Sequence, residues 1–477
     1  MTALPPDLLL ASQEDLASSP TFDVLDPATG SVIGTVVDAT PSDATRAVDA
    51  AAAAFPAWSS LPARSRAEVL RRCHDLMVRD SERLTRLITA ENGKSVADAR
   101  AEVAYAAEFF RWFSEEAVRG EGSYGEAPAG GARILVTHVP VGVAALVTPW
   151  NFPAAMATRK IAPALAAGCT VVLKPAAETP LTALAVAGLM REAGVPDGVV
   201  NVVTTTDAAG VVTSWIEDPR VRKVSFTGST AVGRALLRQA ADRVLNTSME
   251  LGGNAPFVVT ADADVDAAVA GAMVAKFRGG GQACTAANRF YVHADVADRF
   301  VAKLGAAVTA LRVGPAVDER SQVGPVISEK ELTGITELVE SAVAHGARIA
   351  AQAPAPATGW FYPPTVLVDV PVGAAILAEE IFGPVAPVVT WSDESTMLAS
   401  VNDTEFGLAA YVYAGRLQDA LRIGDRIEAG MVGVNRGIVS DPAAPFGGVK
   451  QSGLGREGAR DGLREYQETR YFSIDWS

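Results

Sequence analysis

The strongest constraint on the fold is an alternation of short apolar runs with helical stretches between about residues 142 and 250. In order, the segments are VGVAALVTPW, TVVLKP, LTALAVAGLMREAG, VVNVVTT, KVSFTG and STAVGRALLRQAADR. Strands that alternate with helices form βαβ units, whose strands lie parallel in one sheet. From residue 253 the pattern starts again with APFVV, VDAAVAGAMVAKFR and RFYVHA, and it continues to about residue 430. The chain therefore predicts two parallel α/β layers.

The segments outside these layers also carry structural signals. Residues 41 to 118 show the pattern of successive amphipathic helices, and Thr40 with Pro41 is typical of an N-cap followed by the first helical position. The segment ARILVTHVPVGVAALVTPW holds two β-rich runs separated by Pro140, which favours a hairpin or a pair of adjacent strands. We find no repeat of solenoid period and no low-complexity linker.

The composition excludes several classes of partner. With 477 residues, 49% hydrophobic and 20% charged, the chain can bury large cores, and its length suggests about three domains. The net charge of −14 disfavours nucleic acid or an anionic membrane surface as a partner. No apolar run is long enough to span a bilayer, so we expect no membrane partner.

The N-terminus and the cysteines indicate the cellular compartment in which we expect the protein. No basic residue precedes the short leucine run near the N-terminus, so we expect no signal peptide. Three cysteines far apart in the chain fit a reducing cytoplasm better than a disulfide framework. No two of the four histidines have metal-ligand spacing, so we expect no metal site.

Residues 277 to 292, FRGGGQACTAANRFYV, contain the first candidate for chemistry. Three consecutive glycines allow the backbone to approach something closely, and they lead to Cys284. A thiol is partly ionised near neutral pH, and a local positive potential would activate it further. The alternative is a buried structural cysteine, which we expect for Cys73 and Cys169. His74 adjoins Cys73, but neighbours on a helix point to different faces, so this pair is no catalytic dyad.

Asn151 is the second candidate. It lies in TPWNFP, directly after an apolar run, and the carboxyl ends of strands in open α/β sheets are where ligands bind. Its amide could donate to a developing oxyanion. A turn bounded by proline, with asparagine supplying turn geometry, explains the same residues.

KVSFTGSTAVGR places Gly228 and Gly233 across a strand-to-helix turn, with Ser229 at the cap. A helix N-terminus binds phosphate readily, but the glycine spacing is neither that of a dinucleotide fingerprint nor that of a Walker loop. A plain capped helix is an equal alternative. Lys174, at the end of the run TVVLKP, could reach a ribose or a phosphate, although lysine is usually a solvated surface residue.

Glu250, in MELGGNAPF, lies among apolar residues and glycines with no helical ion partner in sight. Desolvation there would raise its pKa and make it a usable base; a carboxylate in a strand-end turn is the alternative. Together, these pieces suggest one reaction. A thiolate attacks a carbonyl, an asparagine holds the oxyanion, a dinucleotide accepts hydride and a carboxylate activates water.

At this point the chain resembles the aldehyde dehydrogenase superfamily over nearly its whole length. The motifs that carry the resemblance occur in family order: TPWNFP, KPAAETP, FTGSTAVG, MELGGN, GQAC, EEIFGPV and PFGGVKQSGLGREG. It implies two Rossmann-like α/β parallel-sheet domains plus a β-hairpin oligomerisation arm. The dinucleotide-binding domain would comprise residues 1–120 and 141–251, the catalytic domain 252–455, and the arm 121–140 and 456–477. That arm should pair across subunits, because an open β edge otherwise invites uncontrolled pairing, so we expect a homodimer or homotetramer.

The resemblance implies a role for each candidate. Cys284 would be the nucleophile, Glu250 the general base and Asn151 an oxyanion donor beside the Cys284 backbone N–H. Lys160 matches a family lysine that is linked to proton movement. The residues implied for the NAD or NADP site, including pyrophosphate, ribose and cleft contacts, are Trp150, Lys174, Ala177, Gly228, Ser229, Gly233, Glu380 and Phe382.

Within the superfamily the chain looks most like the succinate-semialdehyde dehydrogenases. These bind the substrate carboxylate with two arginines and a serine, and the matching positions are Arg159, Arg278 and Ser440. Arginine offers bidentate geometry to a carboxylate, although each arginine could also be an ordinary surface residue. The implied reaction is oxidation of succinate semialdehyde through a thiohemiacetal and a thioester, with water as the final acceptor. Alternatives are another aldehyde such as glutarate semialdehyde, an acylating reaction with coenzyme A, and a catalytically idle member of the fold.

Three departures from the family pattern bear on this expectation. Ala177 stands where the family often has a glutamate that reads the adenosine ribose, so a 2′-phosphate is not repelled and NADP is admissible. Gly279 stands where asparagine is common, which loosens the loop before the cysteine. Ala286 stands where several semialdehyde dehydrogenases carry a second cysteine, which excludes a local disulfide switch.

Overall fold

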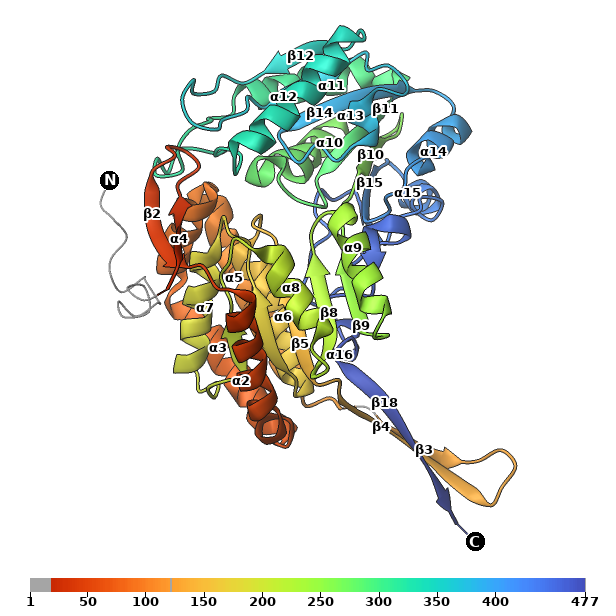
Figure 1. The fold of residues 1–477 in the computed structure, drawn as a ribbon. Coiled ribbons are helices and arrows are strands. Elements are labelled where there is room, and N and C mark those ends of the chain that lie inside the picture. Colours follow the sequence, from red (N-terminus) through yellow and green to blue (C-terminus); the bar gives the residue numbers. More distant parts are fainter. Residues whose placement is uncertain (1–18, 121, 477) are drawn as a thin grey trace.

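The computed structural model describes residues 19–120 and 122–476, so the parts of the expected domains at 1–18, 121 and 477 lie outside the described residues. Figure 1 shows two α/β bodies side by side and a narrow β arm that projects away from them, with the C-terminus at its tip. Two parallel-sheet bodies and an arm are what the sequence predicts. Among the residues that the structure describes, no helix combines the length and apolarity needed to cross a bilayer.

The first sheet has six strands in the order β17-β9-β8-β5-β6-β7. All are parallel except β17, which is antiparallel to β9. The expected boundary at residue 455 assigns β17 to the second domain, but its pairing places it in the first sheet. The bounds are β5 (Val143–Val147), β6 (Thr170–Lys174), β7 (Val200–Val202), β8 (Val221–Thr227), β9 (Asn246–Glu250) and β17 (Gly453–Leu454).

The central strand β5 shows why this sheet needs helices on both faces. Ala144 and Leu146 belong to one core cluster, whereas Val143, Ala145 and Val147 belong to another. Successive side chains of a strand point to opposite faces, so a strand that is apolar throughout is covered on both sides. All five β5 residues are indeed buried.

Two groups of helices provide that cover. One face packs against α2 (Pro41–Ser59) and α8 (Ala208–Glu217). The other packs against α6 (Pro153–Ala167) and α7 (Pro180–Glu192), with α3 (Ala63–Arg79), α4 (Ser81–Asn92) and α5 (Val96–Glu116) behind them. A short hairpin, β1 (Thr21–Leu25) and β2 (Val32–Val37), precedes α2. The predicted start of α2 is confirmed, since Thr40 and Asp43 form a capping box ahead of Pro41.

The second sheet has seven strands in the order β12-β13-β14-β11-β10-β15-β16, all parallel except β12. Its strands are β10 (Ala255–Val259), β11 (Ala287–His293), β12 (Arg348–Gln352), β13 (Thr365–Val368), β14 (Val385–Trp391), β15 (Ala409–Tyr413) and β16 (Met431–Val434). The helices of this body are α10 (Val265–Ala272), α11 (Ala294–Thr309), α12 (Glu329–Ala344), α13 (Ala375–Ala378), α14 (Glu394–Asn402) and α15 (Leu417–Gly424).

The arm is a three-stranded antiparallel sheet with β4 (Ala132–Pro140) between β3 (Ser123–Glu126) and β18 (Gln467–Asp475). A short helix, α16 (Asp461–Arg464), precedes β18. The expectation that the two runs around Pro140 form a hairpin or adjacent strands is wrong. β4 belongs to the arm and β5 to the first sheet, because only β5 is apolar enough to be buried on both faces.

Candidate active site

Three neighbouring strands of the first sheet direct polar residues to one edge. Asn151 follows β5, Gly228 and Ser229 follow β8, which ends at Thr227, and Glu250 ends β9. These strands are parallel and adjacent in the sheet. Their carboxyl ends therefore meet at the edge where open α/β sheets bind ligands. After Ser229 the chain enters α9 (Thr230–Ala241).

The glycine run brings Cys284 to the same place. Helix α10 continues as a π-helical turn, η2 (Met273–Phe277), and then as η3 (Arg278–Gly281). Gly279, Gly280 and Gly281 have φ of +58°, +66° and +72°, a left-handed conformation that costs other residues about 1–2 kcal/mol each. A Cβ on Gly281 would lie 2.3 Å from the Gly383 carbonyl oxygen. All three glycines are therefore favoured by the backbone conformation, and Gly281 is also required by close packing.

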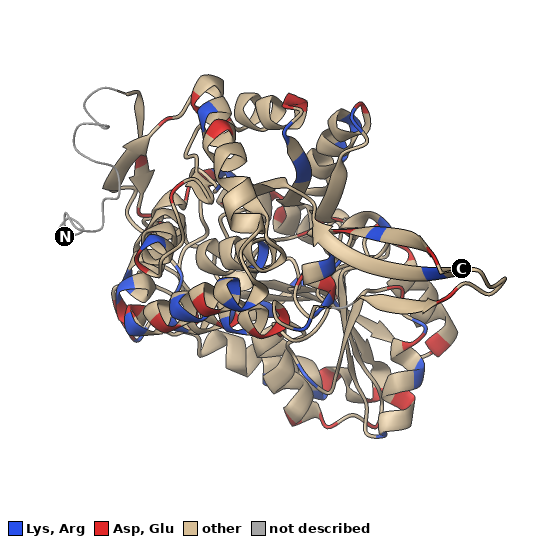
Figure 2. Ribbon diagram, turned by 90° about the horizontal axis from the view of Figure 1, so that it is seen from below, with Lys and Arg blue, Asp and Glu red and all other residues tan. Residues whose placement is uncertain are grey.

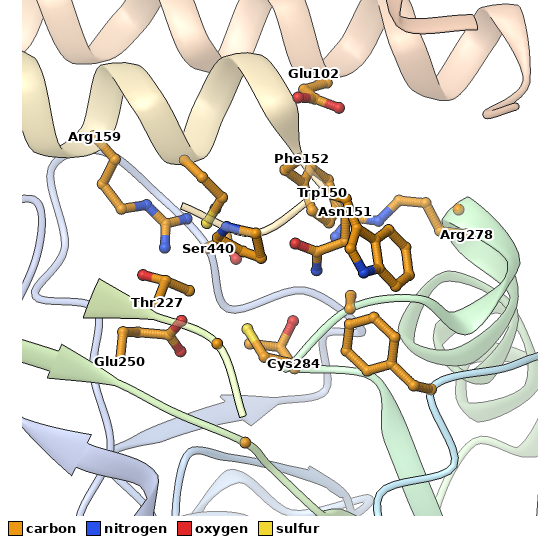
Figure 3. A pocket seen from close by; sticks show the side chains of 18 of the residues that line it. Glu102, Trp150, Asn151, Phe152, Arg159, Thr227, Glu250, Arg278, Cys284 and Ser440 are labelled. Carbon is orange, nitrogen blue, oxygen red and sulfur yellow. The ribbon is translucent and has the colours of Figure 1, made fainter. Parts of the chain in front are cut away.

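The loops enclose a cavity of about 480 Å³ that both Cys284 and Glu250 line. Cys284 is half-buried and Glu250 is buried. In Figure 3 the thiol and the carboxylate lie at the same end of the cavity, with Asn151 pointing toward it. The Asn151 amide nitrogen donates to the Gln282 carbonyl over 3.1 Å, which ties this side chain to the loop that carries the cysteine. The structure thus brings the three predicted catalytic side chains together.

The electrostatic environment of Cys284 differs from the expectation. Burial raises the pKa of the thiol well above its usual range, and the Glu250 and Glu380 carboxylates raise it further against the effect of Arg159. The expected local positive potential that would ionise this thiol is therefore absent, and that prediction is wrong. Desolvation and two acidic neighbours outweigh one guanidinium, so these surroundings favour the protonated thiol.

Glu250 has the properties of a base that works near neutral pH. Neither carboxylate oxygen has a hydrogen-bond partner among the described residues. Burial, and then the neighbouring Glu457, raise its pKa to about 7, while Arg159 and Lys160 act in the opposite direction. A carboxylate with that pKa exists in both protonation states near pH 7, as general acid–base catalysis requires.

Lys160 does not line the cavity, but its charge acts on Glu250, which does. Its ammonium donates to Glu457 over 2.5 Å and to the Ser225 hydroxyl over 2.9 Å. Burial raises the pKa of Glu457, but Lys160 and Arg159 outweigh that effect and leave it below its usual value. Lys160 and Arg159 therefore both pair with the ionised carboxylate of Glu457.

The three residues predicted to bind a substrate carboxylate all line the cavity. Arg159 donates to the Tyr105 hydroxyl over 2.9 Å and stacks on Phe446, 4.1 Å from the ring centroid. Its Nε is buried without a partner in the described chain. Arg278 faces the Phe152 ring and forms no ion pair with any described residue. Ser440 completes the set, and the cavity therefore holds cationic hydrogen-bond donors that are not fully used.

The same cavity is also lined by residues suited to a dinucleotide. Ser229 caps α9, and N–H groups at a helix N-terminus suit a phosphate. Among the described residues Glu380 accepts the Gly253 N–H, over 3.1 Å, which leaves acceptor positions for ribose hydroxyls. Burial raises its pKa to about 8. Trp150 and Phe382 pack edge to face at 5.3 Å. This donor set fits NAD or NADP.

Three predicted cofactor residues lie outside the cavity. Lys174 ends β6, is buried and donates to the Pro175 carbonyl over 2.8 Å. Ala177 follows in the next turn. Gly233 packs against Leu251, where a Cβ would lie 2.4 Å from a methyl carbon. The absence of a side chain at Gly233 therefore serves helix packing, and the contacts of all three residues with a cofactor stay predictions.

The sequence reasoning missed several residues at the site. Tyr105 and Glu102 come from one face of α5, Lys94 from the turn before it, and Glu457 from the segment before α16. The i, i+3 spacing of Glu102 and Tyr105 is a weak signal, because such pairs are common on helices. Glu457 lies within the quoted motif PFGGVKQSGLGREG, where a closer reading could have found it.

Comparison with known proteins agrees with this geometry. Residues 15–472 match the model of the aldehyde dehydrogenase family. A succinate-semialdehyde dehydrogenase from Paenarthrobacter nicotinovorans is 55% identical over 93% of this chain and 99% of its own. A glutarate-semialdehyde dehydrogenase from Pseudomonas aeruginosa is 48% identical over 96% of this chain and 95% of its own. The crystal structure of an NADP-dependent enzyme from E. coli, 48% identical, superposes with a TM-score of 0.94 over 96% of this chain and 95% of that one.

Proposed function

Since the chain belongs to the aldehyde dehydrogenase family, it is an NAD(P)-dependent aldehyde dehydrogenase, and we propose that its substrate is succinate semialdehyde. The product would be succinate. Membership of the family gives the reaction type, and the cofactor is NAD or NADP. The identity of the aldehyde and the role of each side chain are what we propose here.

The reaction would begin with attack of the Cys284 sulfur on the aldehyde carbon. The thiol must lose its proton in that step, and the neighbouring Glu250 carboxylate is placed to accept it. The carbonyl oxygen becomes an oxyanion, to which the Asn151 amide and the Cys284 backbone N–H would donate. The nicotinamide, when bound, supplies the acceptor for the hydride that leaves the thiohemiacetal carbon, and a thioester remains on Cys284.

After releasing the thiol proton to solvent, Glu250 would take a proton from water, and the resulting hydroxide would attack the thioester carbonyl. Collapse of that adduct releases succinate and returns Cys284 to the thiol. Because Glu457 is held ionised by Lys160 and Arg159, it disfavours a second negative charge on Glu250 and keeps that group basic enough for this step. The retained base favours water over coenzyme A as the acceptor.

The observation that carries the substrate proposal is the unused cationic capacity of the cavity. Arg278 has no ion pair among the described residues, whereas Arg159 pairs with Glu457, and both arginines line the cavity. A carboxylate on the far end of the substrate would give Arg278 an ionic partner and would lie near the Arg159 guanidinium. Relatives named for succinate and glutarate semialdehydes support an aldehyde with a terminal carboxylate.

Replacement of Arg278 tests this proposal. In Arg278→Ala we expect kcat/KM for succinate semialdehyde to fall about 10- to 100-fold, because a hydrogen bond to a charged group contributes about 1.5–3 kcal/mol. The rate with butanal, which has the same carbon chain but no carboxylate, should not change. Arg348→Ala is a matched control, since Arg348 pairs with Asp369 on the surface.

An equal loss with both aldehydes would rule out a carboxylate-binding role. The same assay separates the second candidate, glutarate semialdehyde, which is one methylene longer. If that aldehyde gives the higher kcat/KM in the wild-type enzyme, the proposed substrate is wrong, although a loss confined to carboxylate-bearing aldehydes would still support the carboxylate site. If no aldehyde supported reduction of NAD or NADP, the assignment of an aldehyde dehydrogenase activity would be wrong.

We also propose that the protein is cytoplasmic and forms a homodimer or homotetramer through the arm. All three cysteines are unpaired, which suits a reducing compartment. Both faces of the arm expose large apolar side chains, including Tyr124, Tyr471 and Trp476. Pairing with another copy would cover them and the open strand edges.

A further inference from the structure

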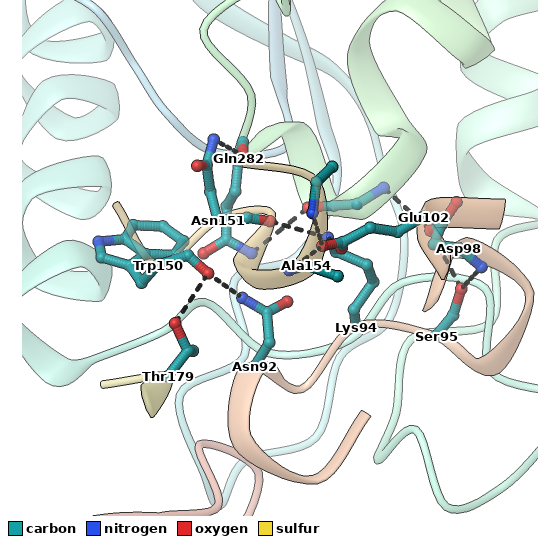
Figure 4. Close-up of polar contacts among 12 residues, drawn as sticks. Asn92, Lys94, Ser95, Asp98, Glu102, Trp150, Asn151, Ala154, Thr179 and Gln282 are labelled. Atoms are coloured by element: carbon teal, nitrogen blue, oxygen red, sulfur yellow. Dashed lines mark hydrogen bonds and ion pairs between the residues drawn. The ribbon is translucent and has the colours of Figure 1, made fainter. Parts of the chain in front are cut away.

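A buried ion pair between Lys94 and Glu102 lies next to the cavity but has no part in the reaction described above. Both side chains are almost fully buried, with 3% and 0% of their surface exposed. Figure 4 shows the pair packed under the turn that carries Trp150 and Asn151. We infer that Lys94 and Glu102 are positioning residues that fix Asn151 for oxyanion stabilisation. The inference rests on the proposed role of Asn151.

Lys94 holds the backbone of Asn151 directly. Its ammonium donates to the Asn151 carbonyl over 2.7 Å as well as to Glu102, and it lies 3.8 Å from the centroid of the Phe152 ring. Asn92, two residues earlier, donates to the Trp150 carbonyl over 3.0 Å. Two successive carbonyls of the turn are therefore held by the segment that joins α4 to α5.

Local structure explains how this segment reaches the turn. Helix α4 ends at Gly93, whose φ of +78° reverses the chain, and a Cβ there would lie 2.6 Å from a carbon of Pro325. Ser95 then caps α5. The backbone of Lys94 is fixed between the glycine C-cap of α4 and the serine N-cap of α5. The direction of its side chain is therefore restricted.

Glu102 holds the other side of the same turn. Its second oxygen accepts the Ala154 N–H over 2.9 Å and lies 3.4 Å from that of Ala155. These are free N–H groups in the first turn of α6, whose N-cap residue, Phe152, has no side chain able to cap it. One ion pair thus fixes the carbonyl of residue 151 and the amide of residue 154.

Asn151 is held between these two anchors. One N–H of its side-chain amide is taken by the Gln282 carbonyl, which leaves the second N–H for the cavity. Replacing a buried ion pair by apolar residues is often neutral or stabilising, so stability alone does not explain Lys94 and Glu102. An oxyanion donor, in contrast, works only when it is placed before the reaction begins.

The test is a double-mutant cycle read by the burst of NAD(P)H formation in a single turnover. Lys94→Met combined with Glu102→Gln removes both charges while keeping an oxygen acceptor for Ala154. We expect this variant to slow the burst roughly 10- to 100-fold, because the oxyanion donor is misplaced. Asn151→Ala should slow the burst at least as much. Adding the Lys94 and Glu102 changes to Asn151→Ala should then slow the burst no further.

Glu91→Gln is a matched control. Glu91 is a buried carboxylate near the C-terminal end of α4. It accepts N–H groups of Leu181 and Thr182, in the first turn of α7, and no hydrogen bond joins it to Asn151 among the described residues. We expect it to lower the melting temperature without slowing the burst. If the double variant is too unstable to purify, the single change Lys94→Met, which leaves Glu102 with its N–H donors in the first turn of α6, should still slow the burst, and only when Asn151 is present.

Two results would overturn the inference while leaving the proposed function intact. One is a wild-type burst in the double variant. The other is a combined variant with Asn151→Ala whose burst is slowed by the product of the two separate effects. The pair would then act independently of Asn151. An unchanged burst in Asn151→Ala alone would instead contradict the proposed role of Asn151, on which the inference depends.

Discussion

At the scale of single residues, the carboxyl groups in and beside the cavity have surroundings that separate their pKa values. Burial raises the pKa of Glu250 to about 7 and that of Glu380 to about 8. The pKa of Glu457 stays below its usual value because two cations outweigh the effect of its burial. Groups whose environments push their pKa values apart take different roles. Glu457 is a fixed charge, and Glu250 is the group that can gain and lose a proton near pH 7.

This separation predicts a pH dependence. A base works only in its deprotonated form, so steady-state turnover should rise as the pH increases through about 7 and should level off when Glu250 is fully ionised. In Glu250→Gln, turnover should fall roughly 10²- to 10⁴-fold and the rise near pH 7 should disappear. Stopped-flow and steady-state measurements of NAD(P)H across pH 5.5–9, a range set about the pKa, provide the check. A variant with wild-type turnover would show that another group activates the water.

At the scale of elements, the turn before the nucleophile depends on glycine. Gly281 has a φ of +72° and lies against the Gly383 carbonyl, so Gly281→Ala should destabilise the fold by more than the roughly 1–2 kcal/mol of a left-handed alanine. Because the loop carries Cys284, alkylation of that thiol by iodoacetamide should change as well. Thermal unfolding and alkylation rates measure the two effects.

Gly334→Ala is the matched control for that change. Gly334 lies within α12, where a Cβ would meet no atom within 4 Å. Alanine is favoured over glycine in a helix by about 0.5–1 kcal/mol, so this variant should unfold at a higher temperature. If Gly281→Ala behaves in the same way, the account of the glycine run is wrong.

Pairs of elements also determine what the site contains. Tyr105 and Glu102 reach the cavity because α5 packs on α6, and α6 begins directly after the turn with Asn151. Helix α9 packs closely on the end of β9 because Gly233 leaves room for Leu251. The distance of the helices from the strand ends therefore sets the shape of the cavity.

At the scale of the whole molecule, the arm has no core of its own. Lys, Arg, Asp and Glu are spread over the two bodies and also occur on the arm (Figure 2). The arm in addition exposes 64% of Tyr471, 43% of Phe472 and 60% of Trp476. Exposed apolar side chains beside open strand edges indicate an interface. We expect the protein to behave as a dimer or tetramer in solution.

Phe472→Glu tests this expectation. A buried, unpaired carboxylate is costly, so the variant should shift the molar mass measured by light scattering toward that of one chain. Val372→Glu, at a fully exposed position of the second body, should leave the mass unchanged. A monomeric wild-type protein, or an oligomer indifferent to Phe472→Glu, would contradict the proposed arm contact.

The sequence by itself determined the features that depend on neighbouring residues. The apolar runs of β5, β6 and β10, the N-cap of α2 and the parallel α/β layers follow from local periodicity and short-range sterics. Cys284, Glu250 and Asn151 were found because each stands in a short segment whose composition suits its chemistry.

Only the tertiary structure decided the features that depend on distant residues. The sequence suggested an ionised thiol. In the structure Cys284 lies beside Glu250 and Glu380, which are 34 and 96 positions away in the chain. Burial and these two carboxyl groups raise the pKa of the thiol instead of lowering it. The separation of β4 from β5 and the contact of Lys94 with the Asn151 carbonyl were likewise unpredictable. Electrostatic energy and packing depend on distances in space, and those are fixed only when the two sheets and their helices come together.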